Sequence, residues 1–303
     1  MEKIIKNKSE ALMFVAAIIL ALGIYYLPKT PAKNAVGVSP SVKSAESLID
    51  EVNPKSGYTI NAEYGDIGYK LVRDGAIDFK KFKSVYDQSG APLTDEQIKI
   101  LSDGLSKKIT VNSDNAYFLL NFFWALGLAN KNPVLDNGEM TKYGKDKINS
   151  FASTGGWTIG KKPVMEIYSN SKIIVLTSEQ QKKVEEVSAN VYRPCCGNST
   201  AFPDCNHGMA LLGVLELMAS NNASTEEMFE AAKYFNAFWF SQNYLDLALY
   251  FKTKEGLDFK DIDAKILMSK EYSSASGWRE TKKWLTENNL IEKAPASGGS
   301  CGV

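Results

Sequence analysis

Histidine is the scarcest chemically active residue of this sequence, with His207 as the single example in 303 residues. One histidine excludes metal sites built on two or three imidazoles of the same chain, and it excludes the H-E-x-x-H motif of metalloproteases. An excess of either charge is also lacking: Lys+Arg and Asp+Glu both number 35, which argues against a nucleic-acid-binding surface. The G-x-x-x-x-G-K-[ST] motif of nucleotide-binding proteins is absent. What is present is an apolar content of 44%, enough for a sizeable core.

A charge-free apolar run near the N-terminus predicts a membrane segment. Residues 11–27 follow a lysine-bearing start and, as a helix, would reach roughly 25 Å, close to the ~30 Å of a bilayer core. Two interpretations compete, an uncleaved signal anchor and a cleaved signal peptide, and the lack of an A-x-A site beyond Leu27 favours the anchor. Because a basic flank stays in the cytoplasm, we expect a single-pass protein of the cell membrane with most of the chain outside.

Helical patterns dominate the remainder, so we expect a mainly α fold in which a transmembrane helix precedes a globular helical ectodomain. Residues 151–176 differ, because glycines flank Trp157 and a strand-like run follows, which indicates either a small β-hairpin near 155–176 or an irregular loop. The predicted parts are a cytoplasmic N-terminus (1–10), a transmembrane signal anchor (11–27), a flexible stalk (28–42), an α-helical ectodomain (43–290) and a flexible tail (291–303).

Within the ectodomain, hydrophobic periodicity and capping residues predict a succession of helices. Capping boxes are expected where Thr94 is followed by Gln97 and where Ser224 is followed by Glu227. The predicted helices cover residues 41–52, 66–73, 79–86, 92–105, 113–129, 139–151, 178–192, 206–219, 224–240, 243–251, 258–268 and 276–288.

The segment before the apolar helix at 206–219 gathers most of the reactive side chains. Three of the four cysteines and the only histidine fall within 13 residues, from Cys195 to His207. Three thiolates and one imidazole are a donor set for zinc, and thiolate-rich sites also suit copper(I) or an iron–sulfur cluster. We therefore predict a metal site at Cys195, Cys196, Cys205 and His207 for zinc, copper or iron. Because Cys195 and Cys196 are adjacent, they are expected to form a vicinal disulfide or to bind two different atoms.

Four neighbouring residues are predicted to support this site. Asp204 is the expected N-cap of the following helix, which would make Cys205 its first residue and let the helix N-terminus stabilise a Cys205 thiolate. Arg193 would lower a thiolate pKa, hold an anion or form a surface ion pair. Asn206, next to Cys205, is also predicted to support the metal site. Glu216 is a lone carboxylate on an apolar helix, either a proton donor with a raised pKa or the partner of a nearby cation.

Cys301 lies near the end of the predicted flexible tail and is expected to serve as an auxiliary thiol in metal relay or thiol–disulfide exchange. Three functions stay open, and with them the question of whether the protein is an enzyme. The first is metal handling or redox chemistry by a bound ion or small cluster. The second is a metal-free thiol–disulfide oxidoreductase that uses Cys205 and Cys301, and the third is a disulfide-stapled binding or scaffold module. The expected partners are the membrane and a protein of a metal or thiol relay, with no nucleic acid.

Overall fold

The computed structural model describes residues 42–292 of the chain. The predicted cytoplasmic N-terminus, the predicted membrane segment (11–27) and Cys301 lie outside the described residues. Within 42–292, no helix has both the length and the apolar character needed to cross a bilayer. The membrane anchor therefore stays a prediction, and the described residues correspond to the predicted ectodomain (43–290).

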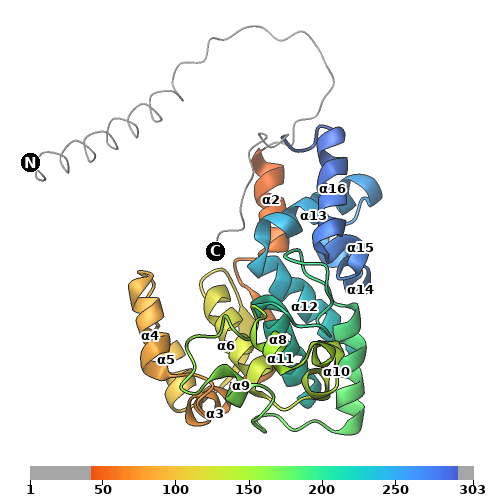
Figure 1. Cartoon of the computed structure of the whole chain (residues 1–303). Coiled ribbons are helices and arrows are strands. Elements are labelled where there is room, and N and C mark those ends of the chain that lie inside the picture. The colour runs from red at the N-terminus through yellow and green to blue at the C-terminus, as the bar shows by residue number, and fades with distance from the viewer. Residues whose placement is uncertain (1–41, 293–303) are drawn as a thin grey trace, which may run out of the picture. The chain divides into compact units, whose positions relative to one another are not determined.

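Helices make up most of the described chain, so the predicted mainly α fold is confirmed (Figure 1). The longer helices are α2 (Val42–Val52), α4 (Phe79–Gln88), α6 (Ala116–Ala129), α10 (Ser178–Asn190), α11 (Asn206–Ser220), α12 (Thr225–Trp239), α13 (Ser241–Glu255) and α16 (Ala275–Glu287). The shorter helices are α3 (Ile67–Arg73), α5 (Asp95–Ser102), α7 (Pro133–Asp136), α8 (Lys145–Asn149), α9 (Val164–Ile167), α14 (Ala264–Leu267) and α15 (Lys270–Ser273), with 3-10 turns η1 (Glu139–Tyr143) and η2 (Phe259–Asp261).

Helix starts follow the local capping signals closely. Thr94 and Ser224 each accept a hydrogen bond from the backbone three residues on, and Gln97 and Glu227 return one, so both predicted capping boxes are confirmed. The helix predicted over 139–151 is wrong as a single element, because Gly144, with φ of 76°, separates η1 from α8. The helix predicted over 258–268 is likewise divided, into η2 and α14.

A two-stranded antiparallel sheet, which the sequence analysis did not predict, joins β1 (Tyr58–Gly65) to β2 (Leu105–Val111). On β1 the side chains of Ile60, Ala62 and Tyr64 are buried and alternate with exposed neighbours, as expected for a strand with one face on the core. Tyr, Thr and Ile favour strands, so this alternation was a local signal for β1 that the prediction of helices overlooked.

The β-hairpin expected near 155–176 is wrong. This segment contains α9 and otherwise irregular backbone, and Ser171 forms only an isolated parallel bridge with Asn130. The strand-like residues Ile173 and Ile174 are buried in the core, so their apolar character serves packing and not sheet formation.

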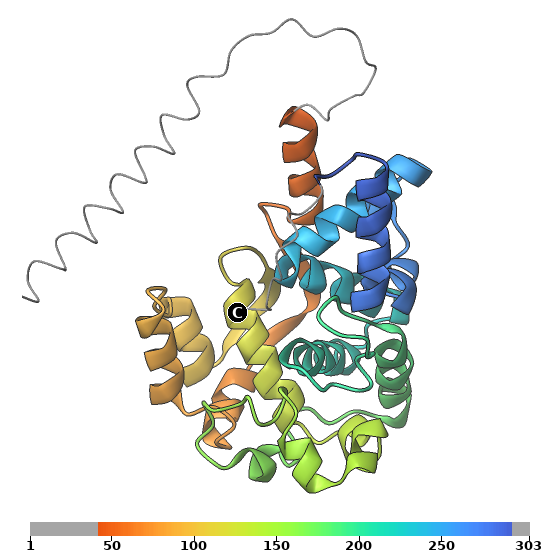
Figure 2. The same ribbon diagram turned by 45° about the horizontal axis from the view of Figure 1, so that its top comes forward.

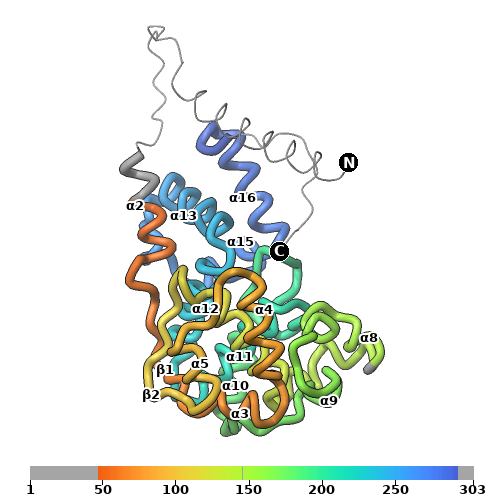
Figure 3. Tube along the Cα trace, turned by 90° about the vertical axis from the view of Figure 1, so that its left-hand side faces the viewer, coloured from red at the N-terminus to blue at the C-terminus, as the bar shows by residue number. Residues whose placement is uncertain are grey.

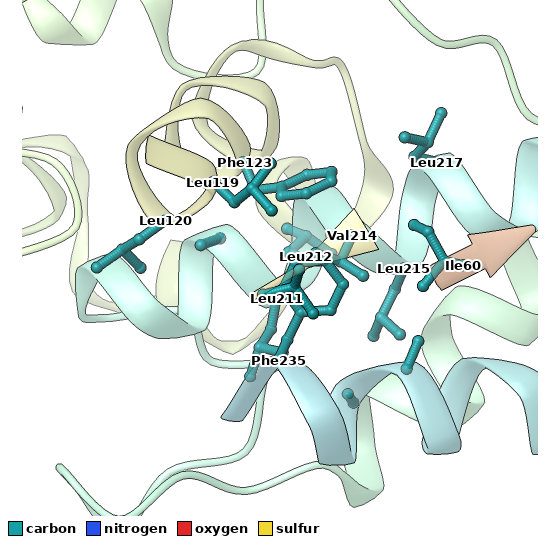
Figure 4. Packing of buried hydrophobic residues seen from close by; sticks show 14 of the residues in the cluster. Ile60, Leu119, Leu120, Phe123, Leu211, Leu212, Val214, Leu215, Leu217 and Phe235 are labelled. Atoms are coloured by element: carbon teal, nitrogen blue, oxygen red, sulfur yellow. The ribbon is translucent and has the colours of Figure 1, made fainter. Parts of the chain in front are cut away.

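The core is centred on the crossing of α6 and α11, where two glycines meet. A Cβ atom on Gly213 would lie 2.5 Å from the Phe123 carbonyl oxygen and 2.9 Å from the Gly127 nitrogen. The two helices therefore approach this closely only because Gly127 and Gly213 carry no side chain. Figure 2 shows α11 between α6 and α10. Figure 4 shows the packed side chains of α6 (Leu119, Leu120, Phe123), α11 (Leu211, Leu212, Val214, Leu215, Leu217), α12 (Phe235) and β1 (Ile60).

Different secondary-structure elements lie at the two ends of the fold. Figures 1 and 3 show α2, α13 and α16 together at one end, and Figure 3 shows the sheet towards the other. The loop between α10 and α11 contacts the C-terminal helices, because its backbone is hydrogen-bonded to residues at the end of α14 and the start of α16. The Cys/His segment is thus fixed between the central helix α11 and the C-terminal helices.

Candidate metal centre

Backbone hydrogen bonds hold the base of the loop between α10 and α11. The Thr200 amide donates to the Val191 carbonyl over 2.8 Å, and an antiparallel bridge joins Tyr192 to Ser199. The Tyr192 amide also donates over 2.8 Å to the Met268 carbonyl, which ties the loop to the end of α14. These hydrogen bonds therefore join the two sides of the loop at its base and fix them relative to α14.

A tight turn directs the two adjacent cysteines to different surroundings. The Cys196 amide donates to the Arg193 carbonyl over 3.4 Å, and Pro194 occupies the turn position that proline favours. Cys195 is exposed, whereas Cys196 is half-buried and its carbonyl accepts from the Ala275 amide over 2.8 Å. The two neighbouring thiols thus have different partners.

Arg193 is completely buried beneath the loop, and its guanidinium organises the loop from within. Its Nη1 donates to the Asn198 carbonyl over 3.0 Å, and its Nη2 donates to the Phe202 carbonyl and to Asp204 Oδ1 over 3.2 and 2.6 Å. Its Nε donates to Cys205 Sγ over 2.9 Å. A planar guanidinium can serve these acceptors together, which a lysine ammonium cannot.

The expected N-cap of α11 is wrong by one residue. Asp204 does not cap the helix, because its Oδ1 accepts from Arg193 and its Oδ2 accepts from Asn198 Nδ2 over 2.8 Å. Cys205 is the N-cap instead, and its Sγ accepts from the Gly208 amide over 3.4 Å. The sulfur therefore lies at the positive end of the helix dipole.

The four predicted donors, together with Asp204, form two overlapping groups of three. In one group, the ligand atoms of Cys195, Cys205 and His207 all lie within 4.8 Å of one another. In the other, those of Cys196, Asp204 and Cys205 meet the same limit. Cys205 belongs to both groups, and the Sγ atoms of Cys195 and Cys205 are 3.5 Å apart. None of the three described cysteines forms a disulfide.

These contacts favour a thiolate at Cys205. Hydrogen bonds from Cys195 and Cys196 hold the pKa of the Cys205 thiol well below its usual value against the effect of burial, and the Arg193 cation lowers it further. The hydrogen bonds that Cys195 makes with Cys196 and Cys205 raise the pKa of the Cys195 thiol. Burial would lower the pKa of Arg193, but the neighbouring cysteine charges outweigh it and raise that pKa.

His207 lies in the first turn of α11 and contacts two aromatic rings. The centroid of its ring is 4.3 Å from that of Phe240 and 5.9 Å from that of Trp239. Asn206 begins the helix, and its Oδ1 accepts from the His207 amide over 2.9 Å. The aromatic contacts restrict the imidazole to the side of α11 that carries the cysteine sulfurs.

Two residues that matter here were missed from the sequence. Asn198 fixes the Asp204 carboxylate. Gly208 makes room for Arg193, because a Cβ atom at this position would lie 2.5 Å from the guanidinium carbon. A glycine in the first turn of an otherwise apolar helix was the available signal, since glycine disfavours helices unless another group approaches closely.

Glu216 belongs to a separate buried cluster on α11. It is nine residues beyond His207, roughly 13 Å along the helix axis. Its Oε1 accepts from Asn132 Nδ2 over 2.6 Å, and its Oε2 and Asn130 Nδ2 are without a hydrogen-bond partner. Burial raises the pKa of Glu216 well above its usual value, although Asn130 and Asn132 oppose the shift. The carboxyl is therefore placed away from the metal-ligand groups.

Comparison with known proteins identifies no relative of this chain: no family model, no curated protein and no solved structure matches it. The functional argument therefore depends on the geometry of the Cys/His loop.

Proposed function

We propose that the loop before α11 binds one thiophilic metal ion, with zinc as the best fit, through Cys195, Cys205 and His207. The spacing of the donor atoms carries this proposal, because all three lie within 4.8 Å of one another and the two sulfurs are 3.5 Å apart. In a tetrahedral zinc site with Zn–S bonds of about 2.3 Å, two sulfurs are about 3.8 Å apart. An ion would therefore enter with a shift of only about 0.3 Å between the sulfurs.

Charge balance supports a divalent ion. Two thiolates cancel the charge of Zn²⁺, and Arg193 is already paired with Asp204 over 2.6 Å. The occupied loop then carries no net charge, which avoids the cost of an uncompensated charge in a partly buried place. Copper(I) accepts the same donors but would leave one negative charge over.

A site with three protein donors keeps one coordination position open, as zinc sites that bind water or substrate do. Asp204 is a poor fourth ligand, because both of its carboxylate oxygens already accept hydrogen bonds from Arg193 and Asn198. Cys195 is exposed, so the open position would be reached from solvent. We therefore assign the site a role in metal handling, in which the ion is exchanged with another molecule.

The test is metal binding by the full-length protein, purified without oxygen in mild detergent and titrated separately with Zn²⁺ and Cu⁺ against competing chelators. A four-ligand zinc site is worth about 10–16 kcal/mol, so one ligand accounts for roughly 3 kcal/mol, or about 100-fold in Kd. Cys195→Ser, Cys205→Ser and His207→Ala should each weaken binding by about that factor. Elemental analysis of the same samples should give one ion per chain.

Cys196→Ser is the matched control, because it removes a thiol from the same turn but not from the proposed donor set. Mutation of a residue that only contacts the ligands typically lowers metal affinity by at least roughly tenfold. Cys196→Ser should weaken metal binding by less than this. Equal losses for Cys195→Ser and Cys196→Ser would contradict the three-donor site. Failure of every ion to bind above background would overturn the proposal and favour the metal-free thiol–disulfide oxidoreductase.

The membrane location is a separate proposal that depends on residues 11–27, which lie outside the described residues. If these residues anchor the chain, the Cys/His loop is held on the extracytoplasmic side. Alkaline extraction of membranes should then leave the full-length protein in the pellet, and deletion of residues 11–27 should release it.

A further inference from the structure

Two of the three proposed ligands are close enough to react with each other. The Sγ atoms of Cys195 and Cys205 are 3.5 Å apart, and a disulfide bond is about 2.05 Å long, so the sulfurs need to approach by about 1.5 Å. These two residues lie on the two sides of the loop, ten positions apart in the sequence. The bond would therefore close the loop without rearranging the helices.

The two sulfurs differ in their freedom to move. Cys205 Sγ is fixed, because it accepts hydrogen bonds from Arg193 Nε over 2.9 Å and from the Gly208 amide over 3.4 Å. Cys195 is exposed at the turn and has room to change its side-chain torsion. The approach is therefore a movement of the Cys195 side chain towards a stationary sulfur.

Cys196, the neighbouring cysteine, makes contacts that Cys195 does not make. Its Sγ lies 3.9 Å from the Asn198 carbonyl and 4.0 Å from Asp204 Oδ1, and its own carbonyl accepts from the Ala275 amide over 2.8 Å. Cys196 Sγ also lies within 4.8 Å of Cys205 Sγ, but these contacts hold it on the inner side of the loop. The pair that we expect to form a disulfide is therefore Cys195 with Cys205, whose sulfurs are 3.5 Å apart.

We propose that hydrogen peroxide converts Cys195 and Cys205 to a disulfide and that this reaction releases the metal ion. One sulfur attacks a peroxide oxygen, the O–O bond breaks, and a sulfenic acid and hydroxide form. The second sulfur attacks the first, the S–O bond breaks, and a second hydroxide leaves. The two hydroxides become water with the two thiol protons in the metal-free protein and with protons from solvent in the metal-bound protein, whose sulfurs are thiolates. In both cases the products are one disulfide and two waters, so the sulfurs lose the two electrons that the peroxide gains.

Release follows from the loss of both sulfur ligands. Thiolates, and not disulfide sulfurs, bind metal ions, so His207 alone would remain of the proposed three donors. The release step depends on the proposed function, whereas disulfide formation does not. A thiol reductant should restore the dithiol and with it the capacity to bind the ion.

The experiment treats the full-length protein with a few equivalents of hydrogen peroxide, both metal-free and loaded with one equivalent of Zn²⁺. Released zinc is followed with a coloured chelator, and disulfides are mapped by mass spectrometry without reduction. No Lys or Arg lies between Cys195 and Cys205, so a protease that cuts before Asp204 is needed to separate them. Wild type and Cys196→Ser should give the Cys195–Cys205 link, and Cys195→Ser should not.

The outcomes distinguish this inference from the proposed function. Zinc that binds and is then released without a Cys195–Cys205 link, through over-oxidation or a link to Cys196 or Cys301, overturns the inference and leaves the metal site intact. A Cys195–Cys205 link in a protein that binds no zinc overturns the proposed function and the release step together. About one zinc released per link formed, reversed by a thiol reductant, supports both.

Discussion

Arg193 and Glu216 are both ionisable side chains that the fold buries completely, and they lie near opposite parts of the same helix, α11. Arg193 is surrounded by acceptors: the Asp204 carboxylate, the Cys205 sulfur and two loop carbonyls. Within residues 42–292, no cation is paired with Glu216, which accepts one hydrogen bond, from Asn132. The surrounding acceptors thus favour the charged form of Arg193 against the effect of burial, whereas burial disfavours the charged form of Glu216.

The two surroundings imply different roles. A buried charge whose three nitrogens all donate hydrogen bonds positions the groups around it, and here these groups include the Cys205 sulfur of the proposed metal site. A buried carboxyl held neutral by apolar surroundings adds a polar contact between α11 and the segment before α7, with no charge to offer a ligand. Removing the ionisable group should therefore have opposite effects on stability at the two places.

The largest effect is expected for Arg193→Met, which keeps an unbranched apolar side chain and removes the charge and the donors. Asp204 and two loop carbonyls would lose their partner in a buried place, and breaking one side of a buried ion pair typically costs about 3–5 kcal/mol. Urea denaturation of the metal-free protein measures this loss in the free energy of unfolding. Arg193→Lys should recover only part of it.

Arg73 provides the matched control, because it also pairs with an aspartate. Its Nε lies 2.7 Å from Asp74 Oδ1, but its side chain is 52% exposed. An exposed pair of this kind contributes at most about 1 kcal/mol, so Arg73→Met should change the free energy of unfolding little. Similar losses for Arg73→Met and Arg193→Met would break the contrast between a buried organising cation and a surface one.

An intermediate effect is expected for Gly208→Ala, which tests the same guanidinium from the helix side. The new Cβ atom would lie 2.5 Å from the Arg193 Cζ and Nη2 atoms, so Arg193 must move from its acceptors. Overpacking of this kind costs about 1–3 kcal/mol, against a gain of up to about 1 kcal/mol in helix propensity. Gly197→Ala in the same loop meets no atom within 4 Å and should be nearly neutral in the same denaturation experiment.

Residues whose structure depends on their sequence neighbours were predictable. The capping boxes at Thr94 and Ser224 satisfy backbone donors within one helical turn, and the apolar run of α11 needs only burial. The gathering of cysteines with His207 was predictable for the same reason, because 13 residues of chain keep them close wherever the loop lies.

Residues whose structure depends on distant partners were not predictable from the sequence. β1 and β2 pair across about forty intervening residues, and no pattern within β2, Leu-Ser-Lys-Lys-Ile-Thr-Val, announces that partner. Arg193 carries a charge that is normally exposed, so its complete burial follows only from the acceptors that the folded loop provides. Which sulfur faces Cys205 depends on the turn at Pro194, and spacing alone left the two cysteines equivalent.

An effect of opposite sign is expected for Glu216→Gln. Burial raises the pKa of Glu216 well above its usual value, so the folded protein keeps a proton that the unfolded chain loses above the ordinary carboxyl pKa. This contribution is fully present below that ordinary pKa and is lost as the pH rises towards the raised one. Wild type should therefore lose stability relative to Glu216→Gln across that window, by at most about 1.4 kcal/mol per pH unit for one proton.

The measurement is the free energy of unfolding of both proteins in urea at several pH values from 4 to 8, a range that begins near the usual carboxyl pKa and extends well above it. All other titratable groups are the same in the two proteins. Their contributions therefore cancel when one free energy of unfolding is subtracted from the other. Glutamine retains the acceptor for Asn132 and replaces Oε2, which has no hydrogen-bond partner within residues 42–292, by an NH2 group of similar size, so little is lost in packing. A difference that does not change with pH, or one in which wild type gains stability as the pH rises, would mean that Glu216 is ionised in the folded protein and that it, like Arg193, carries its charge in the interior.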